Sequence, residues 1–191
     1  SGEALARRVE AAGIEVIRDP HLPTDVLLRI TDGRTAADLD SAGAQPPPPV
    51  VVDWALDYAR VKHLAAAASP RSLRPGHTAG WDAAVGALQA AGIAVTRLRD
   101  LPALAVMRTV AMLVNEAADA VHFGVADASA VDLAMRKGVN YPLGPLEWAD
   151  RIGIGRVASV LAALAAFYGE DRYRTSPLLR QLLWTHGRFH E

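Results

Sequence analysis

The sequence contains no cysteine among its 191 residues. Disulfide bonds, thiolate metal ligands and a cysteine nucleophile are therefore excluded, and the absence is compatible with a reducing cytoplasm, where we expect the protein to work. No block of lysine or arginine stands out and the net charge is −1, so nucleic acid is not an expected partner. The longest apolar runs, 64–68 and 157–167, are too short to cross a bilayer, so no membrane partner is expected.

The composition is that of a globular protein, with 51% hydrophobic and 21% charged residues. The first residues do not resemble a signal peptide, and the start without methionine suggests a piece of a longer protein. Proline-rich stretches at 46–49 and 69–76 interrupt the pattern, which becomes almost wholly helical after residue 100. We therefore expect a Rossmann-like α/β domain at residues 1–100 and an all-α helical-bundle domain at residues 101–191.

In the first part, short β-rich runs alternate with helical runs. Helices are predicted at 5–12 and 81–91, and strands at 14–17, 25–30, 50–52, 64–68 and 93–96. Residues 11–16 and 90–95 repeat one pattern, in which a helix ends, a glycine caps it and a strand follows. This pattern is typical of the αβ step of a wound parallel sheet, although the region is short for a full dinucleotide-binding fold.

In the second part, helices are predicted at 102–123, 128–137, 145–152, 155–168 and 176–186. The first of these carries an apolar stripe with helical spacing, to which Val106, Val110, Leu113 and Val114 belong. We expect these four residues to form a core or a face that pairs with another helical domain.

Two patterns are candidate cofactor or metal sites. Gly2 resembles the tail of a glycine-rich turn that opens a helix, and Asp19 lies where an acid that binds a ribose would follow the next strand. The alternative, which we favour, is a plain turn without a nucleotide. The six histidines show no metal-ligand spacing, so solvated surface histidines and no metal are expected.

Three polar or loop features have two interpretations each. Asn115 beside the apolar stripe would either fix helices through hydrogen bonds, which we favour, or contact a substrate. Arg172 and Arg174 would either bind a phosphate or pair with carboxylates. The loop at 138–150 holds two prolines and two glycines, so it either turns the chain or forms a rigid wall beside an acyl site. The residues of that wall are Tyr141, Pro142, Leu143, Gly144 and Pro145.

Four ordered motifs in residues 102–183 resemble the C-terminal domain of 3-hydroxyacyl-CoA dehydrogenases. They are 102–117 with Arg108 and Asn115-Glu116-Ala117, then Asp132-Leu133-Ala134-Met135 with Gly138, then Pro142-Leu143-Gly144-Pro145-Leu146-Glu147 with Asp150, and last Arg172-Tyr173 with Ser176-Pro177-Leu178-Leu179. The resemblance implies an NAD-binding Rossmann domain, a His–Glu pair that takes the substrate hydroxyl proton, and a helical domain that closes over the acyl chain and pairs subunits.

The sequence departs from that family at its polar catalytic positions. Met107 stands before Arg108, where the family has an asparagine, and a thioether cannot donate a hydrogen bond as an amide does. Ala66 takes the place of the family histidine, and Thr78 that of the partner glutamate. The resemblance therefore implies a degenerate second copy in a tandem 3-hydroxybutyryl- or 3-hydroxyadipyl-CoA dehydrogenase of the phenylacetate-degradation type.

On this interpretation the chain is a non-catalytic pairing segment of an NAD-dependent enzyme of fatty-acid or phenylacetate catabolism. No cofactor is expected in this segment, although the full-length enzyme would use NAD. Expected partners are an upstream catalytic half or another copy of the helical domain, in a homo-oligomer, and acyl-CoA at most. One alternative is a fragment that retains NAD or acyl-CoA binding and is active with a partner chain. Another is a small-molecule binding module whose pocket is lined by Tyr141, Trp148 and Trp81.

Overall fold

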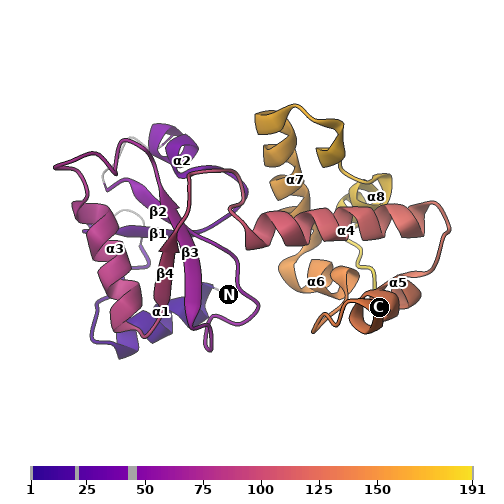
Figure 1. Ribbon diagram of the computed structural model, residues 1–191, viewed down its shortest axis with the longest axis horizontal. Coiled ribbons are helices and arrows are strands. Elements are labelled where there is room, and N and C mark those ends of the chain that lie inside the picture. Colours follow the sequence, from indigo (N-terminus) through magenta and orange to yellow (C-terminus); the bar gives the residue numbers. More distant parts are fainter. Residues whose placement is uncertain (1, 20–21, 43–46, 191) are drawn as a thin grey trace. The chain divides into compact units, whose positions relative to one another are not determined.

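The computed structural model describes residues 2–19, 22–42 and 47–190 and shows two compact units (Figure 1). The first unit is Ser1–Val106 and the second is Met107–Glu191. His21 and Pro46, which belong to predictions made above, lie outside the described residues. The two units are described separately below.

The first unit is built on a mixed sheet of four strands in the order β1-β2-β3-β4. The strands are β1 (Leu27–Ile30), β2 (Pro49–Val52), β3 (His63–Ala68) and β4 (Ala94–Arg97). β1 pairs with β2 and β3 with β4 in parallel, but β2 and β3 are antiparallel. The expectation of a purely parallel sheet is therefore wrong at its centre, because short apolar strands carry no signal of direction.

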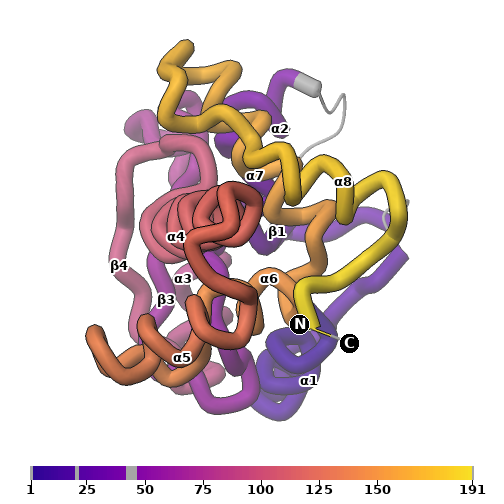
Figure 2. Tube along the Cα trace, turned by 90° about the vertical axis from the view of Figure 1, so that its right-hand side faces the viewer, coloured from indigo at the N-terminus to yellow at the C-terminus, as the bar shows by residue number. Residues whose placement is uncertain are grey.

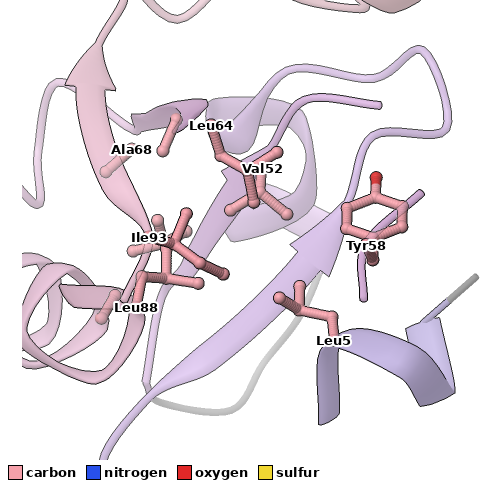
Figure 3. Packing of buried hydrophobic residues seen from close by; sticks show 10 residues of the cluster. Leu5, Val52, Tyr58, Leu64, Ala68, Leu88 and Ile93 are labelled. Carbon is pink, nitrogen blue, oxygen red and sulfur yellow. The ribbon is translucent and has the colours of Figure 1, made fainter. Parts of the chain in front are cut away.

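Helices cover both faces of this sheet. α1 (Gly2–Ala11) and α3 (Ala79–Ala90) share one core with the strands, to which they contribute Leu5 and Leu88. Figure 3 shows Leu88 beside Ile93, Leu64 beside Val52, and Leu5 of α1 below Tyr58. α2 (Ala36–Ala42) lies on the opposite face, where Ala36 packs with Val51 and Ala67. Successive strand residues therefore face different cores, as the period of a strand requires.

The predicted and observed elements of this unit differ at two places. Residues 14–17 have no regular secondary structure and form no ladder with a described strand, so the strand predicted there is absent from the sheet. α2 was not predicted, although Thr35 and Asp38 form a reciprocal capping box at its start. Pro49 opens β2, which is the one position in such a strand where a missing N–H is harmless.

The second unit is helical, and Figure 2 looks along the axis of its long first helix. The elements are α4 (Val106–His122), α5 (Ala128–Gly138), α6 (Pro145–Ile152), α7 (Ile154–Tyr168), the 3₁₀ turn η1 (Asp171–Tyr173) and α8 (Pro177–Thr185). α4 begins four residues later than predicted, because Ala103 and Leu104 have positive φ angles of 60° and 53°. The fold class expected from the sequence, an α/β domain followed by a helical domain, is confirmed.

The core of this unit is formed by one face of each long helix. Its largest fully buried side chains include Met107, Val114, Leu146, Val157, Leu161, Leu164 and Leu179. Within the described residues no single helix is long and apolar enough to cross a bilayer. α6 and α7 reach that length only together, across a bend of 101°, and most of their large apolar side chains are buried in this core.

Candidate functional site

The first unit places side chains without titratable groups at two positions of catalytic interest. Ala66 is fully buried in β3, where it pairs with Val52 on one side and Arg97 on the other. Thr78 is the N-cap of α3 but makes no side-chain cap hydrogen bond. Neither a methyl group nor a threonine hydroxyl takes a proton at neutral pH. That these residues replace the family's histidine and glutamate stays a prediction.

In the second unit, Met107 is fully buried in the first turns of α4. The next residue, Arg108, donates a hydrogen bond to Oη of Tyr168 at 3.0 Å and another to Oη of Tyr173. Its guanidinium also lies 4.7 Å and 5.5 Å from the centres of those two rings. Arg108 therefore holds the start of α4 against α7 and η1 through charge-assisted bonds and cation–π contacts.

Two aspartates, the half-buried Asp100 and the buried Asp53, accept backbone N–H groups at the starts of two helices next to the sheet. Asp100 accepts the backbone N–H groups of Ala36 at 2.7 Å and Ala37 at 2.8 Å, at the start of α2. Asp53 accepts those of Ala105 at 2.9 Å and Val106 at 2.7 Å, at the start of α4. Burial raises the pKa of the Asp100 carboxyl above its ordinary value, against the lowering effect of the two N–H groups.

These contacts decide how well the unit suits a dinucleotide. A pyrophosphate binds the free N–H groups of a helix that follows a parallel strand. α2 follows β1, but its first N–H groups already serve Asp100, whose negative charge would repel a phosphate. The described residues at this helix start therefore do not fit NAD, and we derive no step through it.

The two predicted cofactor residues lie elsewhere in this unit. Gly2 is the first residue of α1, and no described strand leads into that helix. Asp19 follows residues 14–18, which have no regular secondary structure, and lines a groove of about 1330 Å³ beside β1. The structure does not bring Asp19 to the end of a paired strand, because residues 14–17 join no ladder. Their role in cofactor binding stays a prediction.

The predicted wall at Tyr141–Pro145 is fixed to α5 by Asp132. The carboxylate of Asp132 accepts the N–H groups of Leu146 and Glu147, both at 2.9 Å, and so caps α6. Gly144 is buried against that carboxylate, and its own N–H donates to Glu147 Oε2 at 2.7 Å. Tyr141 packs on Trp148 with ring centres 5.3 Å apart, whereas Pro142 stays exposed. The loop is therefore rigid, and its role as a substrate wall stays a prediction.

The C-terminal residues contact α5 and α6, the two helices that this loop joins. Asp150 accepts the N–H groups of Phe189 and His190 at 3.0 Å, and His190 Nε2 lies 2.8 Å from Asp132 Oδ2. Sequence reasoning missed this role of Asp150 and His190, because nothing in their spacing links them to Asp132. In the described part of the chain, no three His, Asp or Glu side chains are placed to hold a metal ion.

The polar residues near α8 have structural partners. Asn115 is buried, donates to Arg174 O at 2.9 Å and accepts Ser176 N–H at 2.8 Å. Arg174 pairs with Asp119 at 2.8 Å, and Arg172 pairs with Glu170. The hydrogen-bonding interpretation of Asn115 and the ion-pair interpretation of the arginines agree with these contacts.

The four residues of the apolar stripe on α4 differ in how deeply they are buried. Val110 and Val114 are buried in the second unit, so they belong to its core. Val106 is 44% exposed, and Leu113 is half-buried. Leu113 also lines a depression of about 330 Å³ with Arg108, Thr109, Met112 and Tyr173. Of the four predicted residues, Val106 and Leu113 therefore keep exposed apolar surface, and their role in pairing stays a prediction.

Comparison with known proteins identifies the two units. Residues 28–102 match the family model described as the 3-hydroxybutyryl-CoA dehydrogenase reduced Rossmann-fold domain. Residues 105–190 match the model of the 3-hydroxyacyl-CoA dehydrogenase C-terminal domain. A curated relative from Escherichia coli, named 3-hydroxyadipyl-CoA dehydrogenase, is 39% identical over 189 residues. The match covers 92% of this chain but 38% of that relative, so the chain spans well under half of the relative's length.

Solved structures of 3-hydroxybutyryl-CoA dehydrogenases are also similar to this chain. The crystal structure of 3-hydroxybutyryl-CoA dehydrogenase from Escherichia coli matches with a TM-score of 0.78 and 38% identity, over 90% of this chain and 35% of that one. The (S)-3-hydroxybutyryl-CoA dehydrogenase from Ralstonia eutropha has a TM-score of 0.70 at 19% identity, over 98% of this chain and 64% of that one, which supports the fold. Because the two family models together match most of its residues, the chain belongs to the 3-hydroxyacyl-CoA dehydrogenase family.

Proposed function

We propose that this chain is the non-catalytic structural and pairing half of an NAD-dependent 3-hydroxyacyl-CoA dehydrogenase. The observation that carries the proposal is the buried Met107, which stands beside Arg108 where the family's asparagine is expected. A thioether enclosed in a core neither donates a hydrogen bond to a substrate oxygen nor reaches one. Loss of a general base alone costs about a hundred- to ten-thousand-fold in rate, and Ala66 supplies no base.

The filled helix starts support the same proposal. The first N–H groups of α2 donate hydrogen bonds to Asp100. They are therefore not available to bind the phosphate groups of a cofactor. The cofactor of the full-length enzyme would then bind an upstream catalytic half. The names of the relatives suggest a substrate such as 3-hydroxyadipyl-CoA or 3-hydroxybutyryl-CoA for that enzyme. The sequence resemblance supports our proposal that the enzyme acts in fatty-acid or phenylacetate catabolism in the cytoplasm.

The pairing role concerns the second unit. Large apolar side chains remain exposed on it, among them Phe123, Val125 and Leu133. A second helical domain of this kind would take the place of the subunit partner in a homo-oligomer, against the upstream half or another copy. Leu113→Asp tests this in the full-length protein, because a charge on the half-buried rim of α4 weakens assembly. Glu116→Asp is its control, because Glu116 lines the same depression one turn away and this substitution leaves the charge unchanged.

Titration of NADH and acetoacetyl-CoA into the purified chain tests whether it binds the cofactor or an acyl-CoA, and an assay with NAD⁺ tests whether it is a dehydrogenase. We expect no binding of either in the micromolar range, and no reduction of NAD⁺ with a 3-hydroxyacyl-CoA thioester. The full-length Escherichia coli relative serves as the positive control for both measurements. Micromolar binding of either compound would instead support the alternative, in which the chain retains NAD or acyl-CoA binding and is active with a partner chain.

A further inference from the structure

The connector that leads from β4 into α4, residues 101–105, has a strained backbone. Ala103 and Leu104 have φ angles of 60° and 53°, so two successive residues are in the left-handed conformation. In that conformation Cβ lies too close to the following carbonyl oxygen. Glycine, and less often asparagine or aspartate, adopts it, normally as a single residue. Neither residue of this pair is of those types, so both are strained.

The strained pair is held by the core of the first unit. Ala103 is fully buried, and Leu104 is 6% exposed. Leu104 packs with Ala36, Val51 and Ala67 on the face of the sheet that α2 covers. Backbone strain of this kind persists only where the surroundings determine the conformation. The packing of Leu104 is one part of these surroundings, and hydrogen bonds provide the other.

The start of α4 is capped by a carboxylate from a distant part of the chain. Leu104 and Ala105, directly before this helix, have no side-chain acceptor that could cap it. Instead, Oδ2 of Asp53 accepts the N–H groups of Ala105 at 2.9 Å and of Val106 at 2.7 Å. These N–H groups directly follow the strained pair. A change of φ in the pair rotates them and therefore breaks both hydrogen bonds.

Asp53 is itself fixed in place on several sides. It directly follows β2 and is 1% exposed. Its N–H donates to Ala65 O at 2.9 Å, and its carbonyl accepts Oη of Tyr58 at 2.9 Å. Its other carboxylate oxygen, Oδ1, accepts the N–H of Trp54 at 2.8 Å. Asp53 is therefore a fixed acceptor, which does not follow the connector when the connector moves.

The connector has a special place in the chain. α4 begins with Val106, the last residue of the first unit, and continues from Met107 in the second unit. The strained pair therefore lies in the covalent link through which the sheet of the first unit leads into the first helix of the second.

We propose that the connector has two conformations. One is the left-handed form, which the two hydrogen bonds to Asp53 and the packing of Leu104 stabilise. The other is a relaxed form with ordinary φ angles, which the connector adopts when the bonds to Asp53 break. Because backbone strain favours the relaxed form and the contacts favour the left-handed form, the connector opens without unfolding of the sheet. Asp53 thus controls the conformation of the link between the units.

A double-mutant cycle in urea tests the proposal, with the NMR signals of β3 to follow the unfolding of the first unit. Ala103→Gly removes strain from the left-handed form and should lower the unfolding equilibrium constant about fivefold. In an Asp53→Ala background, where the connector is relaxed, the same substitution should bring no such gain. An equal gain in both backgrounds would overturn the proposal, and so would no gain in the otherwise wild-type protein.

Ala105→Gly is the matched control, because Ala105 lies in the same connector and its φ is not positive. It should raise the unfolding equilibrium constant about two- to fivefold in both backgrounds, as a glycine normally does where no left-handed conformation is required. A gain from Ala105→Gly as large as that from Ala103→Gly would show that the effect does not come from strain, which contradicts the proposal.

Native-state hydrogen exchange is a second test, which needs no variant that lacks Asp53. The amide protons of Ala105 and Val106 should exchange at least about tenfold faster than those in the centre of β3, because they open with the connector alone. Ala103→Gly should slow them about fivefold. The amide of Ala130, bonded to Asp127 at the start of α5, is the control and should not change. Exchange of Ala105 and Val106 as slow as that of β3 would mean that the connector opens only on global unfolding, and would overturn the proposal.

Discussion

Gly144 and Asp132 lie so close together that any side chain at position 144 would overlap the carboxyl group of Asp132. A Cβ placed on Gly144 would be 2.1 Å from Cγ and 2.3 Å from Oδ1 of Asp132. Asp132 accepts the N–H groups of Leu146 and Glu147 at the same time. The absence of a side chain at one residue is therefore what allows the carboxylate of another to cap α6.

Gly144→Ala should destabilise the second unit, because the methyl group displaces Asp132 from α6. Overpacking of this kind costs about 1–3 kcal/mol, with the loss of the cap in addition. The measurement is the free energy of unfolding in urea. Gly138→Ala is the control, because Gly138 has open space around its Cβ position and an ordinary φ. Equal stabilities of Gly144→Ala and Gly138→Ala would show that Asp132 moves aside without cost.

Asp132→Ala removes the acceptor for two N–H groups, one of which is buried. An unsatisfied buried N–H costs about 1–3 kcal/mol, so the loss should exceed that of an exposed cap. Asp127→Ala is the matched control, because Asp127 caps α5 at an exposed helix start and should cost about 1 kcal/mol. Urea unfolding measures both variants. A smaller effect for Asp132→Ala than for Asp127→Ala would contradict the structural role given to Asp132.

Asp100 should make stability depend on pH in an unusual direction. Burial raises the pKa of its carboxyl in the folded state above that in the unfolded state, so the folded state binds the proton more tightly. Its contribution is therefore fully present below the unfolded pKa and is lost as pH rises through the folded pKa. The difference in unfolding free energy between the wild type and Asp100→Asn should fall over this range. A difference that rises with pH would mean that the N–H groups of α2 outweigh burial.

Asn115→Ala should lower stability by about 1–3 kcal/mol, because it leaves the buried N–H of Ser176 and the partly buried carbonyl of Arg174 without this partner. Glu116→Ala, at the exposed neighbouring position, should stay within about 0.5 kcal/mol of the wild type. Thermal or urea unfolding distinguishes the two. If Asn115→Ala kept full stability and instead weakened acyl-CoA binding to the full-length protein, the substrate-contact interpretation would be correct.

The sequence predicted the helices of the second unit closely, because their signals are local. α5 begins at Ala128 and α6 at Pro145, which are the starts of the predicted ranges 128–137 and 145–152. The start of α4 was placed too early because apolar spacing continues through Ala103 and Leu104. Their backbone turns away from the helix, and a distant residue, Asp53, provides the cap.

In the first unit the sequence predicted where strands occur better than how the strands pair in the sheet. The β-rich pattern at 14–17 is present, yet a strand exists only where a neighbour completes its hydrogen bonds. The reversal between β2 and β3 depends on where the connecting loop leads, which no residue pattern shows. For the candidate site, the sequence motifs already singled out Met107 and Gly144. The capping by Asp100 and the bond between His190 and Asp132 join residues far apart in the chain, so spacing could not reveal them.

Met107→Asn should not create a dehydrogenase in this chain. The amide would restore one polar group of the family pattern but would enter a fully buried position, where an unsatisfied amide costs about 1–3 kcal/mol. We therefore expect a less stable protein and no formation of NADH from NAD⁺ and 3-hydroxybutyryl-CoA, followed by absorbance. Met107→Leu keeps the volume and polarity of the site and should cost less than about 1.5 kcal/mol, which makes it the control. Dehydrogenase activity in Met107→Asn above that in Met107→Leu would show that a proton acceptor survives elsewhere, and that Ala66 and Thr78 do not occupy the catalytic positions.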